Sequence, residues 1–164
     1  MELLVTTAIS GLLLVALLQV VFHTGRSFAA WANYLELDRN SRNALDQMVY
    51  KIRQADELKS FSSNRLVFSY FKTNDLVYEY SPADRTLTET VAGETKTLLT
   101  GCDLLKFAMF QRNTAAGTYD QFPATQTNNT AKLVQLSWTC SRSVLGARIN
   151  SESVQSAKIV IRNQ

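Results

Sequence analysis

A long uncharged run opens the chain. Leu3 to Phe22 is about 20 residues without a charged side chain, and as a helix rising 1.5 Å per residue it would span the roughly 30 Å hydrocarbon core of a bilayer. A cleaved signal peptide is the alternative, but such peptides carry a basic N-terminal region, whereas here only Glu2 is charged before the run. We therefore expect residues 1–25 to be a transmembrane and assembly segment. Its core positions are Leu3, Leu4, Val5, Ile9, Leu12, Leu13, Leu14, Leu17 and Leu18.

Small and polar residues dilute this apolar run. Such residues in a membrane helix usually let neighbouring helices approach closely, so they favour packing against other copies or partner proteins. A solitary anchor with a few tolerated polar positions is the alternative. The residues concerned are Thr6, Thr7, Ser10, Gly11 and Gln19.

The helix is expected to continue well beyond the membrane. No proline occurs before Pro82, and apolar residues recur at the three- and four-residue spacing of one helical face. We expect the helix to end near Lys59, because the following Ser- and Asn-rich residues favour a turn. The predicted stripe comprises Phe28, Trp31, Leu35, Leu45, Met48, Ile52 and Ala55, and the wetter side carries Asp38, Arg39, Arg42, Lys51 and Arg53.

From Arg65 onward the period changes to that of β-strands. β-Branched and aromatic residues alternate in short runs that are separated by polar turns, which predicts a meander of four strands. Two further apolar runs follow around a long polar loop, Arg112 to Ala131, and one strand closes the chain. The expected strands are Leu66–Tyr70, Leu76–Tyr80, Thr86–Val91, Thr95–Leu99, Leu104–Gln111, Lys132–Ser141 and Ser156–Arg162.

These patterns predict an α+β protein, in which one long N-terminal helix packs on a mainly antiparallel β-sheet head. Residues 26–164 would form this head, because 164 residues leave room for one membrane segment and one small domain.

The two cysteines, Cys102 and Cys140, lie too far apart in sequence for a Cys-x-x-Cys metal or redox motif. If the Leu104 and Lys132 strands pair as a hairpin, opposed residue numbers sum to about 243 and the two cysteines sum to 242. Side-chain parity places Cys140 inward but not Cys102, unless a bulge turns it. A disulfide and two buried free thiols both stay open.

The sequence contains no recognisable catalytic, cofactor or metal motif. The only histidine, His23, lies at the predicted membrane boundary away from any cysteine or carboxylate cluster, and no glycine-rich phosphate loop or metal-ligand spacing occurs. The net charge of +3 comes from scattered residues, so no nucleic-acid partner is expected. We expect a protein that is not an enzyme and has no cofactor. The carboxylates expected to be solvated near turns are Asp75, Glu79, Asp84, Glu89 and Glu94.

Glu2 is the one ionisable group at the head of the apolar helix. A carboxylate is costly in lipid, which favours a cationic partner. Alternatively, Glu2 lies in interfacial water, where the helix dipole favours an anion.

The segment MELLVTTAISGL at residues 1–12 resembles the cleavage and methylation segment of type IV prepilins and pseudopilins. Glu2-Leu3-Leu4 matches the end of the family pattern Phe-Thr-Leu-x-Glu-Leu-Leu, while the basic leader, its Gly and the Phe-Thr-Leu portion are absent. The segment 43–55, the succession of short strands and the closing run 159–163 are similar to the J-type minor pseudopilin of type II secretion.

This resemblance implies a pilin-like fold and a structural subunit of a periplasmic pseudopilus, anchored by a single pass in the bacterial inner membrane. Its partners would be other pseudopilins or pilins through the N-terminal helix, with Glu2 pairing with a neighbour's N-terminal amine, and a prepilin peptidase if a leader precedes the chain. The alternatives are a minor pilin of a type IV or competence pilus and an unrelated single-span anchored binding domain.

The chain is expected to begin at an internal methionine or a truncated start. No Lys or Arg precedes the apolar run, while Arg26, Arg39 and Arg42 follow it. Without a basic leader, the positive-inside rule would hold the head in the cytoplasm.

Overall fold

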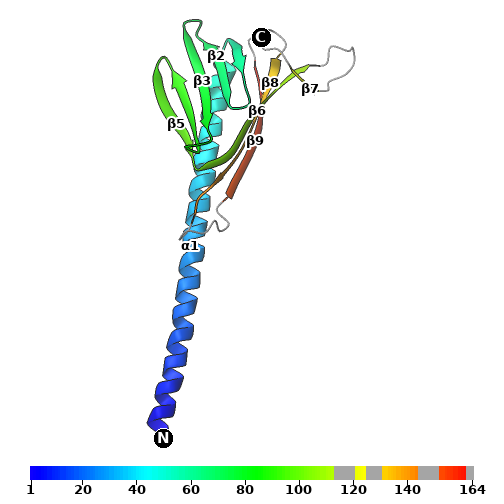
Figure 1. Cartoon of the computed structure of the whole chain (residues 1–164). Helices are drawn as coiled ribbons and strands as arrows, with labels where there is room; N and C mark the ends of the chain where they lie inside the picture. Colours follow the sequence, from blue (N-terminus) through cyan, green and yellow to red (C-terminus); the bar gives the residue numbers. More distant parts are fainter. Residues whose placement is uncertain (113–120, 125–130, 144–151, 162–164) are drawn as a thin grey trace.

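One helix and two antiparallel sheets make up the part of the chain that the computed structural model describes, residues 1–112, 121–124, 131–143 and 152–161. Helix α1 (Glu2–Gln54) is 53 residues long. Figure 1 shows its C-terminal half running alongside the strands and its N-terminal half projecting away from them. The protein is therefore α+β, with a long apolar helix at its N-terminus.

The helix ends five residues before the predicted Lys59. Ala55 has extended dihedral angles, φ −67° and ψ 144°, and its N–H donates to the carbonyl of Ile52 over 3.3 Å. The chain then enters a strand, β1 (Glu57–Phe61), in which Leu58 is buried. Pairing of this segment with the next strand is therefore more favourable than continuation of the helix. The prediction that the helix ends near Lys59 was wrong.

The buried face of α1 also differs from the predicted stripe. Met48 and Ile52 are buried as expected, but Phe28, Trp31 and Leu35 are exposed. On the N-terminal side of Met48, the contact face of the helix consists mainly of small residues, which let the sheet approach the helix backbone closely. The buried residues of α1 are Ala30, Leu37, Ser41, Ala44, Met48 and Ile52.

The first sheet is an antiparallel meander in the order β1-β2-β3-β4-β5. The four predicted strands are confirmed within a few residues, and β1 adds an unpredicted fifth at the edge. The Ala92-Gly93 pair that joins β4 to β5 has φ of 52° and 88°, as a tight two-residue hairpin requires. The other strands are β2 (Arg65–Tyr70), β3 (Asn74–Ser81), β4 (Thr86–Val91) and β5 (Glu94–Thr100).

The second sheet has the order β7-β6-β8-β9 and is also antiparallel. Along most of β6 and β8 the paired residue numbers sum to 243, as in Leu105 with Trp138 and Phe107 with Leu136, so the predicted register is confirmed. Most of the long loop predicted at 112–131 lies outside the described residues. The strands are β6 (Cys102–Arg112), β7 (Gln121–Pro123), β8 (Ala131–Ser141) and β9 (Glu152–Val160).

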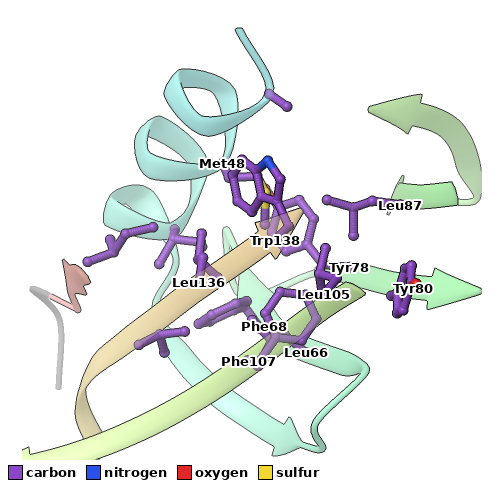
Figure 2. Packing of buried hydrophobic residues seen from close by; sticks show 14 of the residues in the cluster. Met48, Leu66, Phe68, Tyr78, Tyr80, Leu87, Leu105, Phe107, Leu136 and Trp138 are labelled. Carbon is purple, nitrogen blue, oxygen red and sulfur yellow. The ribbon is translucent and has the colours of Figure 1, made fainter. Parts of the chain in front are cut away.

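The core lies where the helix meets both sheets. Figure 2 shows Met48 of α1 beside Trp138, with the buried side chains of the two sheets gathered around them. The indole N–H of Trp138 donates to Ser41 Oγ over 3.3 Å, which satisfies the polar atom of a side chain only 1% exposed. The single core therefore fixes the C-terminal half of the helix against the head.

Candidate functional site: the apolar N-terminal half of the helix

The N-terminal half of α1 has no packing partner in the chain. Residues 1–29 are all exposed, and Ala30 is the first buried residue. Its most apolar stretch has a mean hydropathy of 2.3 and none of it is buried. The helix is therefore long and apolar enough to cross a membrane, and at 1.5 Å per residue the uncharged residues 3–25 extend about 35 Å.

The predicted core positions of this segment point outward on all sides of the helix. Leu3, Leu12 and Leu17 are among the most exposed large apolar side chains of the described chain, at 82%, 72% and 66%. A helix that is apolar all round needs an apolar environment, either lipid or other helices. The same holds for Leu4, Val5, Ile9, Leu13, Leu14 and Leu18, which are also exposed.

Hydroxyl groups in this half bond to the helix's own backbone. Thr6 Oγ1 lies 3.1 Å from the carbonyl oxygen of Glu2 and 3.0 Å from that of Leu3, and Thr7 Oγ1 lies 3.0 Å from that of Leu4. Thr24 makes the same kind of bond to Val20 over 2.7 Å. Because these groups already have acceptors, they can enter a medium without water at little cost.

Glu2 lies in the first turn of α1, at the end of the molecule farthest from the head (Figure 1). No ion pair found among the described residues includes Glu2. Its side chain is exposed, so a cation of a neighbouring molecule can reach it.

An aromatic stripe extends the apolar surface past Arg26. Phe28, Trp31 and Leu35 are 65%, 61% and 46% exposed, and their spacing of three and four residues puts them along one line of the helix. Large aromatic rings with Arg nearby are typical of the membrane–water boundary. The stripe marks the transition from the apolar segment to the head.

A buried charge cluster fastens the opposite end of the helix to the first sheet. Lys51 Nζ lies 2.5 Å from Glu89 Oε1, and the Tyr78 hydroxyl donates to Glu89 Oε2 over 3.1 Å. Burial, followed by the charge of Glu89 and the hydrogen bond to it, raises the pKa of Tyr78 far above its usual value. Tyr78 therefore stays protonated and remains a donor.

The prediction that Glu89 is solvated was wrong, because its residue is 3% exposed. The burial of Glu89 could have been predicted from the sequence. Glu89 lies two residues after the buried Leu87, so both side chains point to the inner face of the sheet, where Lys51 of the helix can contact Glu89. Asp75, Glu79, Asp84 and Glu94 are exposed as expected.

The two sheets are joined at the start of β6 by a second polar cluster. Arg85 Nη2 lies 2.6 Å from Asp103 Oδ1 and donates to the carbonyls of Gly101 and Ser141, each over 3.1 Å. Cys102 and Cys140 lie beside this cluster, directly opposite each other on β6 and β8. Sequence reasoning placed the two cysteines within one register step of each other, but it did not identify the role of the arginine.

Comparison with known proteins found no matching protein-family model, curated protein or solved structure. Among the residues that the structure describes, no three His, Cys, Asp or Glu side chains gather as a metal site. The protruding helix is therefore the feature of this chain from which a function can be argued.

Proposed function

We propose that the protein is a pilin-like structural subunit that is held in a bacterial inner membrane by α1 and packs through the same segment against neighbouring subunits in a periplasmic filament. One observation carries this proposal: a single unbroken helix has a fully exposed apolar half and a half packed into a folded head. An anchor alone needs only a span of about 20 residues. The continuous 53-residue helix instead joins the span to the head without a linker, which suits a rod-like building block.

The composition of the apolar half supports helix–helix contact as well as lipid contact. Gly11 has no atom outside its own helix within 4 Å of the position that a Cβ would occupy, so this side of the helix is open to a neighbour. Helices in membranes associate through small residues, close packing and satisfied hydroxyls. Gly11, Ser10 and the two threonines at positions 6 and 7 provide such a surface on the first four turns.

Glu2 is proposed to be the specific contact of assembly. A carboxylate within lipid is expensive unless a cation accompanies it, and the N-terminal amine of an adjacent subunit would be such a cation in the family that this segment resembles. Each incoming subunit would then bring one carboxylate and receive one amine. The pairing would set the register between neighbouring helices, while the leucines supply most of the contact area.

The type II secretion pseudopilus is the assembly that the resemblance of the N-terminal segment and of residues 43–55 favours. A prepilin peptidase would be a processing partner if a leader precedes the chain. The proposal assigns no catalytic step to the protein, and its work would be assembly.

Replacing the Glu2 carboxylate tests the assembly role. We expect Glu2→Gln to leave membrane insertion and head folding unchanged, because the side chain lies far from the core, but to lower incorporation into filaments by about tenfold or more, as loss of a charge pair in lipid predicts. Carbonate extraction measures insertion, and the ratio of this subunit to the others in sheared filaments measures incorporation. Glu94→Gln, which removes an exposed carboxylate at a hairpin of the head, is the matched control. Normal incorporation of the Glu2 variant would contradict the assigned pairing.

A crosslinking experiment distinguishes the three possible assemblies. A photoreactive amino acid at Leu17 should crosslink to another subunit in the membrane, whereas one at the exposed head residue Lys106 serves as the control for contacts of the head alone. A crosslinked secretion pseudopilin supports the proposal, and a retractile or competence pilus subunit identifies a minor pilin. Crosslinks from position 17 to lipid only would identify a single-span anchored domain instead.

A further inference from the structure

The two cysteines form a buried pair that bridges neighbouring strands. Cys102 begins β6 and Cys140 lies near the end of β8, and the two residues are register partners. Their Sγ atoms are 3.3 Å apart, with the thiol of Cys140 donating to Cys102. The two cysteines are at most 1% exposed, so thiols in solution cannot reach either sulfur. The chain has no third cysteine.

The strand register favours the short distance. The N–H of Ser141 donates to the carbonyl of Gly101 over 2.9 Å, whereas the N–H of Cys102 turns away to the carbonyl of Arg85, also over 2.9 Å. Cys102 and Cys140 therefore occupy a pair without mutual backbone hydrogen bonds, the type of antiparallel pair in which side chains lie closer. The register shift between Cys102 and Leu104 turns Cys102 to the inner face.

Several contacts hold the backbone of Cys102 in this place. Gly101 has φ of +71°, and a Cβ there would lie 2.8 Å from the carbonyl oxygen of Ser141, so the two strands approach too closely for any other residue. The Tyr80 hydroxyl donates to the carbonyl of Cys102 over 3.0 Å. The Arg85 guanidinium joins the carbonyls that flank the pair on both strands. The geometry is therefore built into the fold.

We propose that Cys102 and Cys140 form a structural disulfide that is made while the head folds in an oxidising compartment and then locks β6 to β8. This inference rests on the proposed extracytoplasmic location of the head for its occurrence in the cell, but not on filament assembly. The oxidant is a protein or small-molecule disulfide. One cysteine thiolate attacks the oxidant's disulfide to give a mixed disulfide and release one thiol, and the other cysteine thiolate then attacks that cysteine's sulfur to close the bridge and release the second thiol.

The order of events follows from the burial of both sulfurs. Exchange requires access of the oxidant to a sulfur atom, and in the folded head both sulfurs are buried. The bridge therefore forms before the sheet closes, and once it is formed the same burial protects it from reductants.

The state of the thiols can be counted by mass. Full-length protein extracted from the membrane is unfolded in denaturant, alkylated with and without prior reduction, and weighed intact, while protease treatment of spheroplasts locates the head in the same cells. We expect no alkyl group without reductant and two after reduction. In Cys140→Ser, the matched control, the remaining thiol should take one alkyl group in both cases. Two groups on unreduced wild-type protein whose head is extracytoplasmic would overturn the proposal. One group would also overturn it, because it would indicate a bridge from one cysteine to another molecule.

A refolding experiment makes the test independent of location and of assembly. Reduced, denatured full-length chain is refolded in detergent in a glutathione redox buffer, and it should reach the bridged mass. Chain that has first been refolded in the reduced state should form the bridge at least about tenfold more slowly when oxidised glutathione is added, because the buried thiols require a local opening of the fold. Failure to bridge during refolding would overturn the disulfide, and equal rates would overturn its formation before closure of the sheet. A normal bridge with failed crosslinking at Leu17 would reject only the assembly role.

Discussion

The two halves of α1 differ in what surrounds them although they belong to one helix. In residues 2–29 every side chain is exposed, and the apolar ones cover the helix on all sides. From Ala30 to Gln54 only a narrow face is buried, and the rest carries mostly charged and polar groups beside a few exposed large side chains such as Trp31 and Leu35. The first half thus needs an apolar medium supplied from outside, while the second obtains one from its own head.

This difference shows that apolar content alone does not identify a core. Ala30, Ser41 and Ala44 are small or polar and yet buried, whereas Phe28 and Trp31 are large and exposed. Burial follows from which face the sheets can approach closely, and small residues allow that approach. The large residues on the remaining faces are available for lipid or for another protein.

Removing the first half should have the largest effect. A chain that begins at Arg26 loses the only stretch in the described chain that is long and apolar enough to cross a membrane, so we expect it to move from the membrane to the soluble fraction and to behave as a monomer with mixed helix and strand content. Gel filtration and circular dichroism measure this. A predominantly helical spectrum would contradict the described head, and aggregation would mean that the Phe28 and Trp31 stripe needs a protein partner.

Much of the head followed from sequence because its strands are locally encoded. Thr86–Val91 was predicted as a strand with the bounds that β4 has, and a turn was expected between it and the next strand, where Ala92-Gly93 forms the hairpin. The pairing of β6 with β8 was predicted in register, since the inward positions Val134, Leu136 and Trp138 match those of the partner strand.

The rest depended on contacts between residues far apart in the chain. Strand β1 was missed because Glu57–Phe61 contains no helix breaker and becomes a strand only by pairing with β2. The division into two sheets comes from the bend at Gly101. A single glycine in a sequence does not predict such a bend. The candidate site was recognised in the sequence as an apolar helix, but the pairing of Glu2 stays a prediction because its proposed partner is another molecule.

Shortening a large side chain should destabilise the head much more in the packed half of the helix than in the protruding half. Met48→Ala removes a fully buried side chain between the helix and Trp138 and should lower the free energy of unfolding of the head by about 2–5 kcal/mol. Leu14→Ala, the matched substitution in the protruding half, should change it by less than about 0.5 kcal/mol, because Leu14 is exposed. Denaturant unfolding of the head in detergent, followed by tryptophan fluorescence, measures both. Similar losses from the two variants would contradict the independence of the halves.

The smallest difference concerns two charged residues on the packed half of the helix. Lys51 pairs with Glu89, which is nearly inaccessible, whereas Arg42 pairs with Asp38 one turn away on the helix surface over 2.8 Å, with its own side chain 71% exposed. Lys51→Met removes the cation beside Glu89 and leaves the buried carboxylate with the hydrogen bond from the Tyr78 hydroxyl. This variant should lose about 3 kcal/mol of unfolding free energy. Arg42→Met removes a solvated i,i+4 pair and should cost about 0.3–0.5 kcal/mol.

The double variant Lys51→Met/Glu89→Leu removes the buried charge as well as the pair. It should recover much of the stability lost in Lys51→Met, because an apolar pair of similar size avoids the desolvation of both charged groups. Urea unfolding of the three variants measures these differences, and a double variant less stable than Lys51→Met alone would show that the Glu89 carboxylate stabilises the head through Tyr78 rather than through the helix.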